Sequence, residues 1–251
     1  MVADRDFEVE KLRYNKRALE ILKSENSVLN LDMDWGSQEL LFSDSANAIR
    51  SCFGEKDELL ELGAGTGDHT GKLIKVTNKR VKVLDISEFS LRVLTTRYPN
   101  RAIPILASMD KIPLADGSID GLASFGCLAY ADPIATDSEI LRVIRKGGSA
   151  VIVDTLNNWS IYRVKRFVNY LLGRRSNAVY KRIPNIQRIE NLAENFQSFE
   201  LKFYGFLYPL EIPLRLFLGK KKALKINGKY DHKFSNRFNC LQFILVLKHK
   251  I

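Results

Sequence analysis

Short apolar runs alternate with amphipathic stretches through the middle of the chain, which predicts strands and helices following one another. The run 58–62 suits a short buried strand, and 81–87 suits a second strand that ends in a carboxylate. A helix is expected from Glu88 to about Tyr98, because Pro99 cannot continue it. This alternation over residues 55–155 predicts a parallel sheet with right-handed crossovers. Further elements are expected on either side of it: helices at 1–25, 37–52 and 159–175, and strands at 199–205 and 238–248.

Three glycines follow the first apolar run, at Gly63, Gly65 and Gly67, and Asp68 comes directly after them. Without Cβ atoms, such a turn lets a ligand come close to the backbone at the carboxyl end of a strand. The spacing G-x-G-x-G differs from the G-x-G-x-x-G of dinucleotide sites. The carboxylates of Glu61 and Asp68 would also repel a pyrophosphate. The loop therefore predicts a nucleotide-type site that favours a cation over a phosphate.

The blocks that follow agree with one particular family. Glu61 followed by G-x-G-x-G resembles motif I of the class I S-adenosylmethionine-dependent methyltransferases. Asp85 stands where an acid can bind both hydroxyls of a ribose. Residues 103–114 resemble the family's third strand and adenine-side loop, 115–125 its turn and fourth strand, and 139–153 its helix, glycine turn and fifth strand. The resemblance, which includes the ubiquinone/menaquinone-type enzymes, covers roughly residues 55–155.

The resemblance implies an α/β fold with a Rossmann-like seven-stranded sheet, mostly parallel, with an antiparallel last strand and helices on both faces. It implies S-adenosylmethionine as the cofactor. The expected cofactor-binding residues are Glu61, Gly63, Ala64, Gly65, Gly67, Asp85, Ile86, Ser108, Met109, Asp110, Phe125 and Gly126. The chain has Ser108 where close relatives hold the adenine with an aspartate, and Asp110 follows two places later. No clustered His, Cys or carboxylate set remains for a metal.

Methyl transfer requires orientation of the acceptor and, for a hydroxyl acceptor, removal of a proton. His69, just after the glycine loop, and Tyr130, just after the fourth strand, are the candidate catalytic residues. For His69 the alternative is a helix residue without a chemical role. Tyr130 would need strong tuning to act as a base, because the ordinary pKa of tyrosine is about 10.

Charge divides the chain of 251 residues unevenly. Residues 1–155 carry 20 Lys and Arg against 24 Asp and Glu, whereas residues 156–251 carry 19 against 5. This asymmetry indicates an anionic partner for the C-terminal part. The segment 159–175 is a basic amphipathic helix with aromatics, which suits an anionic membrane surface, and a helix packed on the protein is the other interpretation.

Compartment follows from the cysteines and the N-terminal residues. Cys52, Cys127 and Cys240 are far apart and lack metal-ligand spacing, and residues 1–6 show no secretory pattern. A cytoplasmic protein is expected, with peripheral contact at the inner membrane face as an extension of the membrane hypothesis. No specific nucleic-acid partner is expected, and the oligomeric state stays open.

Three segments are predicted: an N-terminal helical cap at 1–54, the S-adenosylmethionine-binding core at 55–155, and a substrate-binding insertion or lid with the C-terminal strands at 156–251, completing the same domain. The predicted acceptor is a small-molecule or lipid-linked sugar, methylated on a hydroxyl in cell-surface glycan biosynthesis, since 157–175 loosely resembles segments of such enzymes. The alternatives are a quinone or lipid acceptor methylated on carbon or oxygen, an RNA methyltransferase, and a cofactor-binding scaffold without catalysis.

Overall fold

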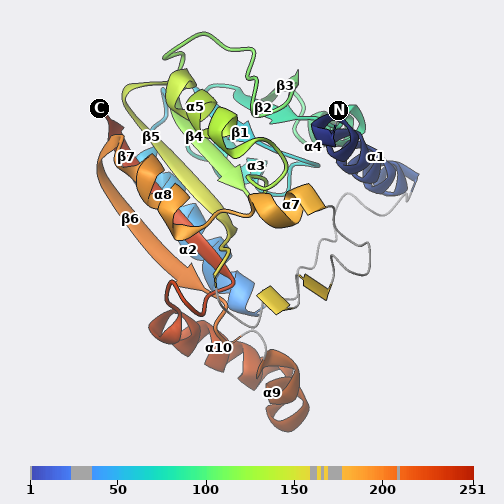
Figure 1. Ribbon diagram of the computed structural model, residues 1–251, viewed down its shortest axis with the longest axis vertical. Helices are drawn as coiled ribbons and strands as arrows, with labels where there is room; N and C mark the ends of the chain where they lie inside the picture. Colours follow the sequence, from blue (N-terminus) through green and yellow to red (C-terminus); the bar gives the residue numbers. More distant parts are fainter. Residues whose placement is uncertain (1, 24–35, 159–162, 165–166, 169–176, 208–209) are drawn as a thin grey trace.

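A single mixed sheet of seven strands forms the centre of the protein (Figure 1). The computed structural model describes residues 2–23, 36–158, 163–164, 167–168, 177–207 and 210–251. The strands are β1 (Leu59–Leu62), β2 (Val81–Asp85), β3 (Ala102–Leu106), β4 (Ile119–Phe125), β5 (Ile144–Thr155), β6 (Phe196–Tyr204) and β7 (Gln242–Lys250). They lie in the order β3-β2-β1-β4-β5-β7-β6, and β7 runs antiparallel to both of its neighbours, β5 and β6. The predicted fold class is confirmed.

Helices cover both faces of this sheet (Figure 1). They are α1 (Val2–Lys23), α2 (Gly36–Cys52), α3 (Thr70–Ile74), α4 (Glu88–Arg97), α5 (Pro133–Val143), α7 (Asn177–Arg182), α8 (Ile186–Ala193), α9 (Glu211–Leu218) and α10 (Lys220–Phe234). One core cluster joins α5 and α8 to the sheet, and a second joins α2, α3 and α4 to the opposite face. Side chains alternate between the faces of a strand, so β1 sends Leu60 and Leu62 into the first cluster and Leu59 into the second.

The glycines of the 139–153 block lie inside a strand rather than in a turn before it. Helix α5 ends at Val143 and β5 begins at Ile144, so Gly147 and Gly148 belong to β5. A Cβ on Gly148 would stand 2.8 Å from the carbonyl oxygen of Asp120 on β4, which only glycine avoids. The pairing of β4 with β5 shifts register at this point, as a β-bulge does.

The last strand begins later than its apolar sequence predicts. The pattern favours a strand from Phe238, but β7 starts at Gln242. Asn236 and Asn239 close a turn instead: the side-chain oxygen of Asn236 accepts from the Phe238 N–H at 2.9 Å, and that of Asn239 accepts from the Asn236 N–H at 2.8 Å. Such side-chain bonds to the backbone compete with strand pairing.

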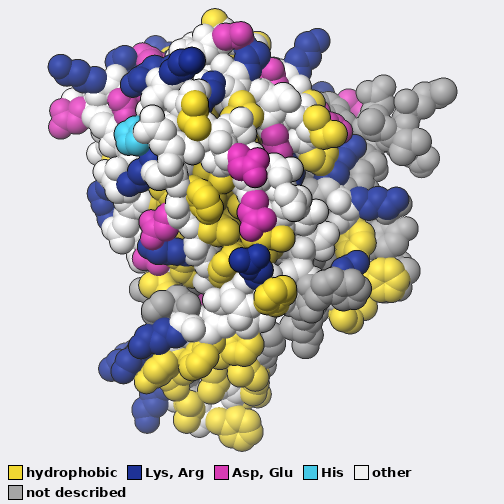
Figure 2. Space-filling model, turned by 60° about the vertical axis from the view of Figure 1, so that its left-hand side comes forward, with side chains coloured by type: hydrophobic (Ala, Val, Ile, Leu, Met, Phe, Trp, Pro, Cys, Tyr) yellow, Lys and Arg dark blue, Asp and Glu magenta, His cyan; other side chains and the backbone are white. Residues whose placement is uncertain are grey.

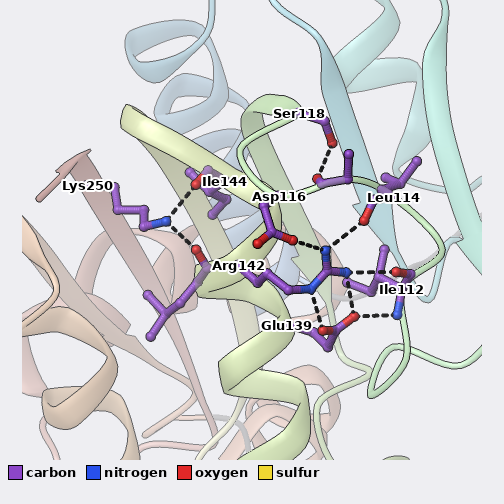
Figure 3. Close-up of polar contacts among 10 residues, drawn as sticks. Ile112, Leu114, Asp116, Ser118, Glu139, Arg142, Ile144 and Lys250 are labelled. Carbon is purple, nitrogen blue, oxygen red and sulfur yellow. Dashed lines mark hydrogen bonds and ion pairs between the residues drawn. The ribbon is translucent and has the colours of Figure 1, made fainter.

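Arg142 fixes the loop before β4 to helix α5 (Figure 3). Its guanidinium donates to the carbonyl oxygens of Leu114 at 2.7 Å and Ile112 at 2.8 Å. It also pairs with Asp116 and with Glu139, each at 2.6 Å. The hydrogen bond from Arg142 holds the pKa of Glu139 below its usual value. Glu139 and Arg142, which belong to the block 139–153, therefore have a structural role.

The predicted segments differ in how much of them the structure describes. Most of the predicted 159–175 helix lies outside the described residues. Helix α2, inside the predicted cap, packs on β5 and β7 and supplies Leu41 and Ile49 to the core. Among the described helices, none combines the length and apolarity needed to cross a membrane. The three-segment division stays a prediction.

Candidate functional site

A pocket of about 200 Å³ opens at the carboxyl ends of β1, β2 and β4, where parallel sheets place their ligands. Nine of the twelve predicted cofactor residues line it: Gly63, Ala64, Gly65, Asp85, Ile86, Ser108, Met109, Phe125 and Gly126. The two predicted catalytic residues, His69 and Tyr130, line it as well. The structure thus brings most of the predicted site into one cavity.

The glycine loop leaves open space on the pocket side and close contact on the core side. Gly65 has φ +52°, and a Cβ built on it would meet no atom within 4 Å. A Cβ on Gly63 would stand 2.5 Å from the Cβ of Cys127. Cys127 is buried, and burial raises the pKa of its thiol to about 12, so it fills space as a neutral group. The loop can accept a ligand against its backbone at Gly65.

Asp85 lies between the glycine loop and the start of α4. One carboxylate oxygen accepts from the Gly65 N–H and the other from the Ser87 N–H, each at 2.8 Å. Burial raises the pKa of Asp85, and the backbone N–H groups of Ser87 and Gly65 partly offset this rise. Each oxygen retains a further lone pair for a ligand hydroxyl. The donor set therefore fits a ribose diol.

Three predicted cofactor residues do not line the pocket. Glu61 is only 1% exposed and lies beneath the loop, where it accepts from the Thr70 hydroxyl at 2.5 Å. Burial raises the pKa of Glu61 to about 8, so its side chain is mainly protonated at neutral pH. Gly67 packs towards Leu94, and Asp110 accepts a long hydrogen bond of 3.4 Å from the Asp132 N–H. Glu61 therefore holds the first residue of α3 instead of lining the pocket.

His69 stands in a stack of rings beside a buried lysine. Its imidazole lies parallel to the Phe125 ring at 4.3 Å. The ammonium of Lys72, 3.2 Å from Nδ1 of His69, also donates to the Ser45 hydroxyl at 2.7 Å and lies 3.6 Å from the centre of the Phe42 ring. Burial, together with Lys72, lowers the pKa of His69 to about 4, and burial lowers that of Lys72 to about 8. At neutral pH, His69 is uncharged beside a mostly charged Lys72.

Helix α1 lies over the pocket and contributes residues that the sequence did not single out. Tyr14 and Arg17 line the cavity from α1. The Tyr14 ring meets the Tyr130 ring edge to face at 5.6 Å, and Arg13 donates to the Tyr130 hydroxyl at 3.4 Å. The Asn15 side chain accepts from the Ser87 hydroxyl at 2.6 Å. The helical pattern at 1–25 predicts a helix here, but not which of its side chains point inward.

Asp68 also lines the pocket, where Arg97 pairs with it at 2.8 Å. Asp68 directly follows the third glycine, and in the sequence this position predicts only that the loop disfavours a pyrophosphate. Among the described residues, no three His, Cys, Asp or Glu side chains gather in a metal-binding group. The side chains of Asp68, Asp85 and Arg17 bring charged groups to the lining of the pocket.

The comparison with protein families matches residues 60–152 to a model described as a methyltransferase domain. An uncharacterized methyltransferase of Mycobacterium tuberculosis is 35% identical over 95 residues, which are 38% of this chain and 38% of that protein. A demethylmenaquinone methyltransferase of Beutenbergia cavernae is 33% identical over 132 residues, 51% of each chain. The chain thus matches about two fifths to one half of the length of these curated relatives.

Solved structures agree on the fold. A geranyl diphosphate C-methyltransferase from Streptomyces coelicolor superposes with a TM-score of 0.56 at 16% identity, over 83% of this chain and 77% of that one. A SAM-dependent methyltransferase from Thermotoga maritima gives a TM-score of 0.55 at 14% identity, over 84% and 90%. Residues 60–152 therefore match a methyltransferase domain, and the seven-stranded sheet has the fold of solved S-adenosylmethionine-dependent methyltransferases.

Proposed function

We propose that the pocket binds S-adenosylmethionine and that the chain transfers a methyl group to a small organic acceptor. The observation that carries this proposal is the pairing of Gly65 with Asp85 at the mouth of an open glycine loop. Asp85 would hold the ribose hydroxyls, and Ile86, Ser108 and Met109 would lie on the adenine side. The open face of Gly65 would accept the amino-acid part.

When bound, S-adenosylmethionine supplies a methyl group on a positively charged sulfur. The protein must orient the acceptor, exclude water and handle any proton that the acceptor loses. His69 and Tyr130 are the proposed residues for this task, since both line the pocket.

The contact with Lys72 bears on the role of His69. With Nδ1 accepting from the Lys72 ammonium, the proton of a neutral imidazole is on Nε2. In this tautomer His69 donates a hydrogen bond, so its proposed role is to orient the acceptor. A general-base role for His69 would require loss of the Lys72 contact.

Two acceptor classes are proposed. The first is the hydroxyl of a small-molecule or lipid-linked sugar in glycan biosynthesis. Support for this acceptor comes from the sequence of residues 157–175, most of which lie outside the described residues. The second candidate is a quinone or other isoprenoid lipid methylated on carbon or oxygen. A specific observation favours it: relatives with 30% and 33% identity carry the name demethylmenaquinone methyltransferase.

Calorimetric titration with S-adenosylmethionine, and separately with NAD, tests the cofactor proposal. Binding of S-adenosylmethionine without binding of NAD is expected, and binding of NAD alone would overturn the proposal. Incubation with isotope-labelled S-adenosylmethionine and either a lipid-linked saccharide or a demethylmenaquinone then tests transfer, with mass spectrometry as the readout. The Asp85→Ala variant is the control for background labelling. Cofactor binding with no labelled product from either acceptor would contradict both acceptor classes and favour a scaffold.

A further inference from the structure

Helices α9 and α10 carry an apolar tip at one end of the molecule (Figure 1). Leu216 is 80% exposed, Phe217 is 85% exposed and Leu218 is 43% exposed. These three large side chains are consecutive and end helix α9. In Figure 2, hydrophobic side chains gather at the lower end of the molecule, bordered by Lys and Arg. Single exposed apolar residues are common, but a cluster of them marks an interaction surface.

Lysines follow this apolar group in the chain. After Gly219, helix α10 begins with three consecutive exposed lysines, and three further exposed lysines lie along the helix on the side away from its packed face. These residues are Lys220, Lys221, Lys222, Lys225, Lys229 and Lys233. The "basic apolar tip" is defined here as Leu216–Leu218 together with these six lysines.

The opposite face of α10 anchors the tip to the protein. Ala223, Asn227 and Asp231, at intervals of four residues, have no exposed surface, and α10 packs against α2. The carboxylate of Asp231 accepts from the Gly205 N–H at 2.6 Å and the Leu207 N–H at 2.7 Å. Asp231 is therefore used internally and places no negative charge at the surface of the tip.

The charges of the lysines at the start of α10 have the wrong sign for the dipole of the helix. The N-terminus of a helix carries partial positive charge, which favours carboxylates there and disfavours cations. Helix α10 has no acidic residue in its first turn and no side-chain hydrogen bond at its N-cap, Gly219. Three consecutive cations at this place favour an anionic partner for this end of the helix.

We propose that the basic apolar tip binds the surface of an anionic phospholipid membrane. Leu216, Phe217 and Leu218 would enter the boundary between headgroups and acyl chains, and the lysines would contact the phosphates. A membrane satisfies both halves of the surface at once, because its outer layer is anionic and its interior is apolar. This inference involves residues other than 159–175, and it holds whether or not the chain transfers methyl groups.

Flotation of the chain of 251 residues with vesicles tests the proposal, using phosphatidylserine in phosphatidylcholine against phosphatidylcholine alone. Binding to the anionic vesicles is expected, weakened by high salt and by Leu216→Ser with Phe217→Ser. The charge variant Lys221→Ser with Lys222→Ser should lose about fivefold in affinity per lysine, as removal of a cation near an anionic surface does. The matched controls are Ile134→Ser, at a site that is also 80% exposed, and Lys56→Ser with Lys111→Ser. These controls should bind like the wild type.

Absence of binding to anionic vesicles would overturn the proposal. Tip variants that bind as well as the wild type would also overturn it, because the contact would then lie elsewhere in the chain. An equal loss of binding in the tip and control variants would overturn it as well. Light scattering of the free protein tests a second copy as the occupant. If the tip variants change the oligomeric state rather than vesicle binding, the tip is a contact between copies and the proposal fails. Calorimetry with S-adenosylmethionine checks that each variant keeps its pocket.

Discussion

At the scale of single residues, Asp85 has two roles. Its carboxylate accepts a hydrogen bond from the Gly65 N–H, and the remaining lone pairs of its oxygens are available at the pocket that it lines. Asp85→Ala is expected to weaken S-adenosylmethionine binding at least about tenfold, or about 1.4 kcal/mol. Calorimetry gives the dissociation constant directly. Glu200→Ala, which removes an exposed carboxylate from β6, is the control and should bind normally. An unchanged constant for Asp85→Ala would refute the ribose assignment.

His69 and Lys72 give a prediction about pH. The pKa of His69 is about 4 in the folded chain and close to the ordinary 6.5 when unfolded. Between these values the unfolded chain binds the extra proton, so this residue makes the free energy of unfolding decrease as pH falls from 6.5 to 4. Replacing Lys72 with Met removes the neighbouring positive charge and should raise the pKa of His69, although burial remains. Titration of the His69 ring signals by NMR measures the change.

Lys75→Met, at the exposed end of α3, is the matched control for this experiment and should leave the pKa of His69 where it is. If Lys72→Met left the titration of His69 unchanged, the ammonium would not be the partner of Nδ1. The donor role proposed for His69 would then lose its basis.

At the scale of elements, Arg142 offers a test that separates structure from function. Arg142→Met removes charge-assisted hydrogen bonds to the 112–116 loop and leaves Glu139 without its cation. We expect the free energy of unfolding to fall by about 2 kcal/mol, with no change in S-adenosylmethionine binding. Urea denaturation and calorimetry measure the two quantities. Arg145→Met breaks one half-exposed ion pair and should cost less than about 1 kcal/mol. Loss of binding in Arg142→Met would mean that the loop shapes the pocket.

The elements also show what the sequence could predict. The strand at 58–62, the glycine loop and Asp85 follow local patterns, and they occur in the structure where those patterns place them. The contact of Arg13 with Tyr130 joins residues 117 positions apart, and no local pattern encodes it. Glu61 has the expected place in the chain, but its side chain is buried against Thr70 of α3 and does not reach the pocket. Local periodicity gives the elements, whereas packing decides which side chains reach the pocket.

At the scale of the whole molecule, the sheet connects the pocket to the C-terminal part. Strand β7 pairs with β5, and α2 packs on β5 and β7 while it also contacts α10. Among the described strands, β6 pairs only with β7, and the Tyr204 hydroxyl at its end donates to Asp44 of α2 at 2.7 Å. The strands that carry the pocket and the described residues after 177 therefore share one sheet and one helix layer. This arrangement favours a single cooperative unit over two independent ones.

Scanning calorimetry of the full chain should accordingly show one unfolding transition. A ligand that binds only the folded state adds about 2.7 kcal/mol at roughly one hundred times its dissociation constant. For a chain of this size, S-adenosylmethionine should then raise the midpoint of the whole transition by about 5 to 10 °C. Two transitions, of which the ligand moves only one, would show that the C-terminal part unfolds separately from the pocket. Helix α10 packs on α2, so that result would also mean that this contact does not couple the basic apolar tip to the cofactor site.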